Sequence, residues 1–309
     1  MTKLYIVVPC YNEEEMLPIT AEKLTEKLDA LMAQQMISPE SRVLLVDDGS
    51  RDRTWELIME LHEKDRRFCG AKLSRNRGHQ NALLAGLMTA KDRCDCAISM
   101  DADLQDDINA VDAMLEKFSE GCQVVYGVRS ARATDTAFKR GTAQGFYKLI
   151  NMMGGELVYD HADYRLLSRQ ALEALSQYKE ANLFLRGIVP MLGYKSAVVT
   201  YERGERAAGE SKYPLKKMLA FAWEGITSLT ARPITILTWT GAGIAAVSAL
   251  TLLILALTGV LNGVGAILCA IGFFGGLNLF ATGVVGQYVG KTYIESKHRP
   301  RYFIEQIVE

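Results

Sequence analysis

The chain has 309 residues, of which 49% are hydrophobic and 23% charged, and its formal net charge at pH 7 is −1. This near-neutral balance argues against nucleic acid or another polyanion as a partner. The hydrophobic residues are unevenly distributed, because no Asp, Glu, Lys or Arg occurs between Pro233 and Gly290. The charged N-terminal part and the uncharged C-terminal stretch therefore need separate explanations.

The first 127 residues alternate between short apolar runs and longer amphipathic stretches. The apolar runs predict strands at residues 4–8, 43–46, 70–73, 96–100 and 124–127. The stretches between them have apolar residues at helical spacing and predict helices at residues 14–34, 54–64, 80–91 and 110–120. Such alternation is typical of βαβ units, so the sequence predicts an α/β fold with a mostly parallel sheet and helices on both faces.

Polar turns follow four of these strands in succession, beginning near Pro9, Asp47, Ser74 and Asp101. In a parallel sheet the carboxyl ends of the strands share one edge, which is where open α/β sheets bind ligands. The ring of Tyr11 can stack on a base, and the carboxylate of Asp48 can accept a hydrogen bond from it. Arg75 can meet a phosphate. The alternative is that each turn only caps the helix that follows.

The turn after the fourth strand contains two acids, Asp101 and Asp103. Side chains two apart along an extended chain point the same way, so both carboxylates are expected in one place. Hard oxygen donors with open positions suit Mg²⁺ or Mn²⁺ bridged to the phosphates of a substrate. The competing interpretation is an acidic turn that caps the next helix.

Several common site patterns are missing from the sequence. It contains no G-x-G-x-x-G, no G-x-x-x-x-G-K-[ST] and no G-x-S-x-G, which argues against a Rossmann dehydrogenase, a P-loop NTPase and a serine hydrolase. The four histidines lack zinc-site spacing. The six cysteines include no C-x-x-C pair and indicate free thiols in a reducing compartment.

Four segments, taken together, resemble the family 2 glycosyltransferases of the GT-A fold. They are Val-Pro-Cys-Tyr-Asn-Glu-Glu at 8–14, Val-Asp-Asp-Gly-Ser at 46–50, Ser-Arg-Asn-x-Gly at 74–78 and Asp-Ala-Asp-Leu-Gln-Asp at 101–106. Within that family the chain is similar over nearly its whole length to polyprenyl-phosphate glycosyltransferases, which include dolichol-phosphate mannose synthases and bacterial undecaprenyl-phosphate glucosyltransferases. One departure is Asp107-Ile108-Asn109, where many relatives have proline. This change falls in the first turn of the next helix and barely affects the site.

The resemblance implies a role for each of several residues. Those expected to bind the nucleotide are Pro9, Tyr11, Glu13, Asp48, Arg75 and Asp101. Those expected to hold Mg²⁺ or Mn²⁺ and the diphosphate are Asp101, Asp103 and Gln105. Those expected to meet the lipid phosphate are Arg129, Arg140, Arg206 and Lys212. Asp101 and Asp103, together with Asp163, form the expected catalytic set.

Two interpretations of Asp163 stay open. It can be a structural partner of Arg165 or a helix cap, or its carboxylate can face the attacking group. A lipid phosphate is already largely ionised at pH 7, so the reaction needs little help from a general base. Asp163 can therefore act as a base or only position the acceptor.

The C-terminal third predicts attachment to a membrane. Residues 213–232 have apolar residues at helical spacing beside Lys216, Lys217 and Trp223, which predicts an interfacial helix; a core helix is the alternative. The uncharged stretch 233–290 exceeds the ~20 residues of one bilayer crossing and predicts a hairpin of helices at about 234–257 and 264–287. Basic residues flank both ends, so the positive-inside rule puts the catalytic domain at 1–212 and the tail at 291–309 in the cytoplasm, at the inner membrane.

We therefore expect an inverting glycosyltransferase that moves glucose or N-acetylglucosamine from a UDP-sugar to undecaprenyl phosphate. The alternatives are a GDP-mannose-dependent mannosyltransferase and a non-catalytic membrane scaffold that retains a nucleotide-sugar fold. The resemblance and the recurring glycines of the hairpin are compatible with a homo-oligomer such as a tetramer.

Overall fold

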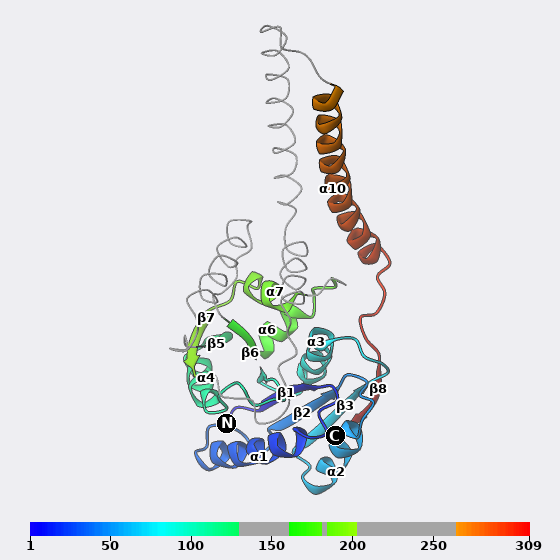
Figure 1. The fold of residues 1–309 in the computed structure, drawn as a ribbon. Helices are drawn as coiled ribbons and strands as arrows, with labels where there is room; N and C mark the ends of the chain where they lie inside the picture. The colour runs from blue at the N-terminus through cyan, green and yellow to red at the C-terminus, as the bar shows by residue number, and fades with distance from the viewer. Residues whose placement is uncertain (130–160, 181–183, 203–263) are drawn as a thin grey trace.

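The computed structural model describes residues 1–129, 161–180, 184–202 and 264–309 (Figure 1). Several predictions lie outside these residues. They concern the lipid-phosphate residues Arg140, Arg206 and Lys212, the interfacial helix at 213–232 and the first hairpin helix at 234–257.

Strands and helices alternate through the N-terminal part, as predicted. The elements up to residue 129 are β1 (Leu4–Cys10), α1 (Leu17–Ala33), β2 (Arg42–Asp47), α2 (Thr54–Lys64), β3 (Phe68–Leu73), α3 (His79–Ala90), β4 (Cys96–Ser99), α4 (Ala110–Ser119) and β5 (Val124–Arg129). They are followed by β6 (His161–Ser168), α6 (Arg169–Leu175), α7 (Leu185–Met191), β7 (Ser196–Tyr201), α10 (Val264–Ser296) and β8 (Ile304–Val308). Each predicted strand and helix before residue 129 is present within a few residues of its predicted ends.

The described strands form one sheet in the order β7-β5-β6-β4-β1-β2-β3-β8. The centre is parallel, because β1 pairs in parallel with β2 and β4, and β2 with β3. β6 runs antiparallel to both β4 and β5, and β8 runs antiparallel to β3. The sheet is therefore mixed, and the predicted α/β fold of the GT-A type is confirmed with a parallel core and antiparallel additions.

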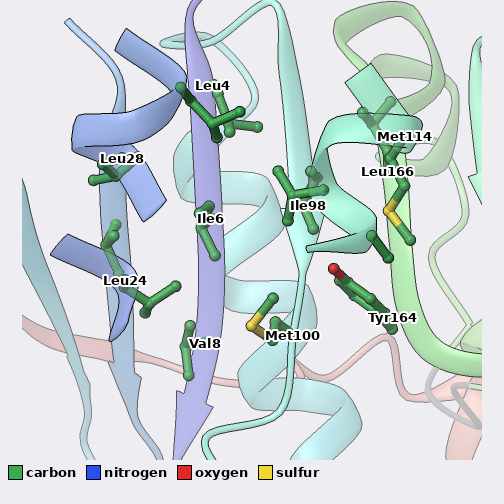
Figure 2. Packing of buried hydrophobic residues seen from close by; sticks show 14 of the residues in the cluster. Leu4, Ile6, Val8, Leu24, Leu28, Ile98, Met100, Met114, Tyr164 and Leu166 are labelled. Carbon is green, nitrogen blue, oxygen red and sulfur yellow. The ribbon is translucent and has the colours of Figure 1, made fainter. Parts of the chain in front are cut away.

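β1 lies in the centre of the sheet, and all seven of its residues are buried. Its even-numbered side chains, including Leu4 and Ile6, pack against α1, where Leu24 and Leu28 lie close by (Figure 2). The odd-numbered side chains pack with α3 on the opposite face. A strand covered on both faces reads as a continuous apolar run, which is why its sequence shows no alternation.

Residues 264–309 contain one long helix, α10, and β8, a strand at one edge of the sheet. α10 extends away from the sheet (Figure 1), and its exposed side chains include Ile267, Ile271 and Val289. The residues after 291, which the sequence suggests are a tail, continue α10 to Ser296 and then form β8 beside β3. In the described ranges, no helix has the combination of length and hydropathy that a membrane span requires. The hairpin stays a prediction.

Candidate active site

The carboxyl ends of β1, β2, β3 and β4 lie on one edge of the sheet. The parallel register sets Cys10 beside Asp47, and Asp47 beside Lys72. Met100, just after β4, donates its backbone N–H to the carbonyl of Val7 at 3.0 Å. The four polar turns that follow these strands therefore leave the same edge, as the sequence predicts.

The first two of these turns are bonded to each other. Asn12, with a positive φ of 54°, donates its backbone N–H to Ser50 Oγ at 3.0 Å. The Oδ1 atom of Asn12 accepts from the Arg51 backbone N–H at 2.9 Å. Glu13 donates its backbone N–H to Thr54 Oγ1 at 2.9 Å. These bonds fix the two turns to each other, and Tyr11, the residue directly after β1, is 42% exposed.

Asp48 holds the third turn in place. Its Oδ1 accepts the backbone N–H of Arg77 at 2.7 Å, and its Oδ2 accepts that of Gly78 at 2.9 Å. Burial raises the pKa of Asp48, while these two N–H donors act in the opposite direction. The expected contact between Asp48 and a base stays a prediction, but its hold on the third turn is a role that sequence reasoning missed.

Gly49 lets the second and third turns approach closely. Its φ is +66°, and a Cβ placed on it would lie 2.6 Å from the backbone carbon of Arg75 and the nitrogen of Asn76. Only a residue without a side chain fits this contact at a positive φ. The expected phosphate contact, Arg75, thus lies on a turn fixed by Gly49 and Asp48.

The fourth turn contains the acidic residues. Asp103 Oδ1 accepts the backbone N–H of Gln105 at 3.2 Å. Leu104 between them has a φ of +52°, which is strained for a branched side chain and keeps the turn tight. Burial raises the pKa of Asp101; His79 lowers it, and the nearby carboxylates of Asp106, Asp163 and Asp103 raise it further. A divalent cation would relieve this crowding of negative charge.

The donor set of this turn fits Mg²⁺ or Mn²⁺ shared with a substrate. Within the residues that the structure describes, no three His, Cys, Asp or Glu side chains converge closely enough to hold a metal by themselves. Asp101, Asp103 and the Gln105 amide oxygen are hard donors, and a nucleotide's phosphates and water can complete the shell. This chemistry matches a cation that arrives with its substrate.

His79 links the acidic turn to Asp163. It is the first residue of α3, and its Nε2 lies 3.5 Å from Asp101 Oδ1 and 3.7 Å from Asp163 Oδ2. Sequence reasoning considered His79 only as a zinc ligand and rejected it. Its place at the end of the third polar turn, where α3 begins, was a usable signal for the site.

Asp163 is a buried carboxylate between two arginines. On β6 it is 11% exposed, forms an ion pair with Arg165 and accepts from Arg186 Nη2 at 3.1 Å. Burial alone would raise the pKa of Asp163, but Arg186, Arg165 and His79 hold it well below the usual range. The structure thus confirms the pairing with Arg165 and also turns this carboxylate toward the acidic turn. Arg186, on α7, has no sequence signal that connects it to the site.

Arg129 ends β5 on the other side of the acidic turn. Its Nη2 lies 3.0 Å from Asp106 Oδ1, and its Nε donates to the Tyr201 hydroxyl at 3.2 Å. Asp106 is nearly fully buried, whereas the Arg129 side chain is 29% exposed. A predicted lipid-phosphate residue therefore lies beside the predicted metal turn.

Comparison with known proteins identifies the family. The profile described as "Glycosyl transferase family 2" matches residues 5–176, which is more than half of the chain. The chain belongs to this family. The glycosyltransferase is 51% identical over 306 residues to the glycosyltransferase YkoT of Bacillus subtilis (strain 168), covering 98% of this chain and 91% of YkoT.

Two further likenesses are more distant. This glycosyltransferase is 37% identical to the bactoprenol glucosyl transferase of Shigella phage SfV, over 98% of each chain. Among solved structures, it is similar to glucosyl-3-phosphoglycerate synthase from Mycobacterium tuberculosis with a TM-score of 0.44 and 15% identity, over 74% of this chain and 78% of that one. That structure contains Mn²⁺, UDP-glucose and phosphoglyceric acid.

Proposed function

We propose that this glycosyltransferase transfers glucose, with inversion, from UDP-glucose to a polyprenyl phosphate at the cytoplasmic face of a membrane. The observation that carries the proposal is the placement of the acidic turn between the polar turns after β1, β2 and β3 and Arg129 at the end of β5, with Asp163 and Arg186 connected to it through His79. Full-length similarity to a bactoprenol glucosyl transferase supports the lipid acceptor and favours glucose over N-acetylglucosamine.

In this proposal the first three turns bind the nucleotide. Tyr11 offers an exposed ring to the base, Glu13 and Pro9 border it, and Asp48 and Gly49 fix the turn on which Arg75 approaches the phosphates. Mg²⁺ or Mn²⁺ held by Asp101, Asp103 and Gln105 would neutralise charge on the departing diphosphate.

On the acceptor side, the residues place an anion rather than remove a proton. An oxygen of the acceptor phosphate forms a bond to the anomeric carbon, while the bond from that carbon to the nucleoside diphosphate breaks and its electrons leave with the diphosphate. The oxygen is already ionised, and Asp163 is a weak base because its pKa is held so low. We therefore assign Asp163 to positioning His79 and Arg186, and Arg129 to the acceptor phosphate.

The return of the chain to the sheet supports the proposed membrane topology. β8 pairs with β3, so residues 304–308 and the N-terminal domain lie in one compartment. Any passage through a bilayer between residues 203 and 303 must therefore occur an even number of times, as in the proposed hairpin. The uncharged stretch 233–290 and the exposed apolar residues of α10 support the same proposal.

The test is a turnover assay with the full chain in neutral detergent. Undecaprenyl phosphate and Mg²⁺ or Mn²⁺ are combined with UDP-glucose, UDP-N-acetylglucosamine or GDP-mannose, and release of nucleoside diphosphate is measured with and without the lipid. We expect lipid-dependent release from UDP-glucose that falls about 100-fold or more in Asp103→Asn. Asp107→Asn, the same change four residues further along the chain, serves as the matched control and keeps near wild-type turnover.

Other results would replace the proposal. Release from GDP-mannose alone would establish the mannosyltransferase. Nucleotide binding without release from any donor would favour the scaffold.

A further inference from the structure

A cavity lies away from the acidic turn, on the α3 side of the sheet. Its volume is about 430 Å³, and it is lined by residues of α3, by the end of α6 and the residues after it, and by residues 298–302 of the connector between α10 and β8. Leu84 and Met88 of α3, with Leu175 of α6, give it an apolar floor. None of the predicted donor or acceptor residues lines it.

The rim of this cavity is basic. Lys179 follows α6, and Arg299 and Arg301 lie on the connector. No Asp or Glu is among the lining residues that the structure describes, although Glu180 and Glu295 are near Arg301. The Arg301 guanidinium donates to the backbone carbonyl of Tyr178, which fixes the connector to the end of α6.

We propose that this cavity binds the phosphate group of a phosphate ester, with Lys179, Arg299 and Arg301 around the phosphate and Leu84, Met88 and Leu175 against an attached apolar chain. Guanidinium groups match phosphate oxygens in geometry and charge. The apolar floor suits an anionic lipid, and the cavity lies where α10 joins the domain, within reach of lipid if α10 is attached to a membrane. A soluble phosphate ester carries the same phosphate group and is the other ligand that this cavity could bind.

The connector also links this cavity to the third turn, the one that contains Arg75. Phe303 accepts the backbone N–H of Ser74 at 3.0 Å, and Ser74 begins the turn that contains Arg75. A ligand that fixes the connector also fixes this turn. We expect a ligand in the cavity to tighten UDP binding at the sheet edge.

The binding test uses the full chain in neutral detergent without nucleotide or metal, so that it is independent of the proposed activity. Dioctanoyl phosphatidylglycerol, uncharged dioctanoylglycerol and inorganic phosphate are titrated separately by calorimetry. We expect the phosphatidylglycerol to bind, and the double variant Arg299→Gln/Arg301→Gln to weaken its binding at least tenfold.

Lys297→Gln is the matched control. It removes the same charge two residues from Arg299, but Lys297 lies 3.9 Å over the ring of Tyr293 and does not line the cavity. Arg299→Gln alone, at an exposed residue, keeps the test valid if the double variant fails to fold, and should weaken binding by itself.

Each outcome decides the proposal or its source. If the phosphatidylglycerol binds and phosphate does not, the ligand is a lipid. If phosphate binds as well, and the arginine variants weaken its binding as much as that of the phosphatidylglycerol, the ligand is a soluble phosphate ester. Equal binding of dioctanoylglycerol and the phosphatidylglycerol overturns the proposal, as does equal weakening by Lys297→Gln and Arg299→Gln. A UDP dissociation constant that does not fall when the cavity is filled overturns the link to the nucleotide turn.

Discussion

Substitution of Gly49 by alanine tests the close contact between the second and third turns. The new Cβ would lie 2.6 Å from two backbone atoms of Arg75 and Asn76, whereas carbon contacts are most favourable near 3.5–4.0 Å, so the third turn must move by roughly 1 Å. Overpacking of this kind costs roughly 1–3 kcal/mol. The positive φ costs a residue with a Cβ roughly 1–2 kcal/mol more. We therefore expect Gly49→Ala to lower the free energy of unfolding by about 2–5 kcal/mol.

Gly193→Ala separates the two contributions. Gly193 has a similar φ of +68°, but nothing lies within 4 Å of the position that its Cβ would occupy, so only the roughly 1–2 kcal/mol conformational cost applies. Urea unfolding followed by circular dichroism measures both variants, and calorimetry measures their affinity for UDP. We expect UDP binding to weaken at least tenfold in Gly49→Ala and not in Gly193→Ala. Equal loss of stability in the two variants, or unchanged UDP affinity in Gly49→Ala, would refute the reasoning.

Three further predictions concern titratable side chains, two of them charged and one a buried thiol. Arg165→Met removes one cation from the buried Asp163 and should lower the free energy of unfolding by about 3 kcal/mol in urea; a loss under about 1 kcal/mol contradicts the pairing. Burial raises the pKa of Cys94 to about 12, so mass spectrometry should find this thiol unmodified by iodoacetamide at pH 8 in the native protein and modified in urea. Although burial raises the pKa of Asp52, hydrogen bonds from Thr54 and backbone N–H groups lower it overall, so its carboxylate stabilises the fold above pH ~4 and loses this effect in acid. Asp52→Asn should therefore be less stable than wild type at pH 7, with a gap that closes toward pH 3; a constant gap contradicts this assignment.

Much of the N-terminal fold could be predicted because its signals are local. The helix predicted at 54–64 has those bounds in the structure, since an apolar stripe and a polar turn fix both ends. The strand ends could be predicted for the same reason, because an apolar run stops where a polar turn begins. Their meeting at one edge followed from parallel pairing.

Pairing between distant segments could not be predicted. β6 inserts antiparallel between β4 and β5, and nothing in its own residues specifies those neighbours. β8 is five residues long with mostly exposed side chains, so it lacks the apolar run of a central strand. The hydrophobic periodicity and composition of a strand predict which of its faces is buried, but not which strand pairs with it.

The site shows the same division. Asp101 and Asp103 were found because both lie in one turn. The roles of Asp48 and Asp163 depend on Gly78 and Arg186, which come from other turns and helices. Such contacts form only when the sheet assembles, so they are visible in the fold and not in the local sequence.

The position of β8 also bears on the order in which the protein matures during translation. β3 keeps an open edge until residues 304–308 leave the ribosome, and an open edge is a site for wrong pairing with other chains. The Ser74 N–H lacks its Phe303 acceptor over the same interval. The third turn therefore gains this support only after residues 303–308 have been made, so a nascent chain that already contains all four polar turns still lacks the contact with β8.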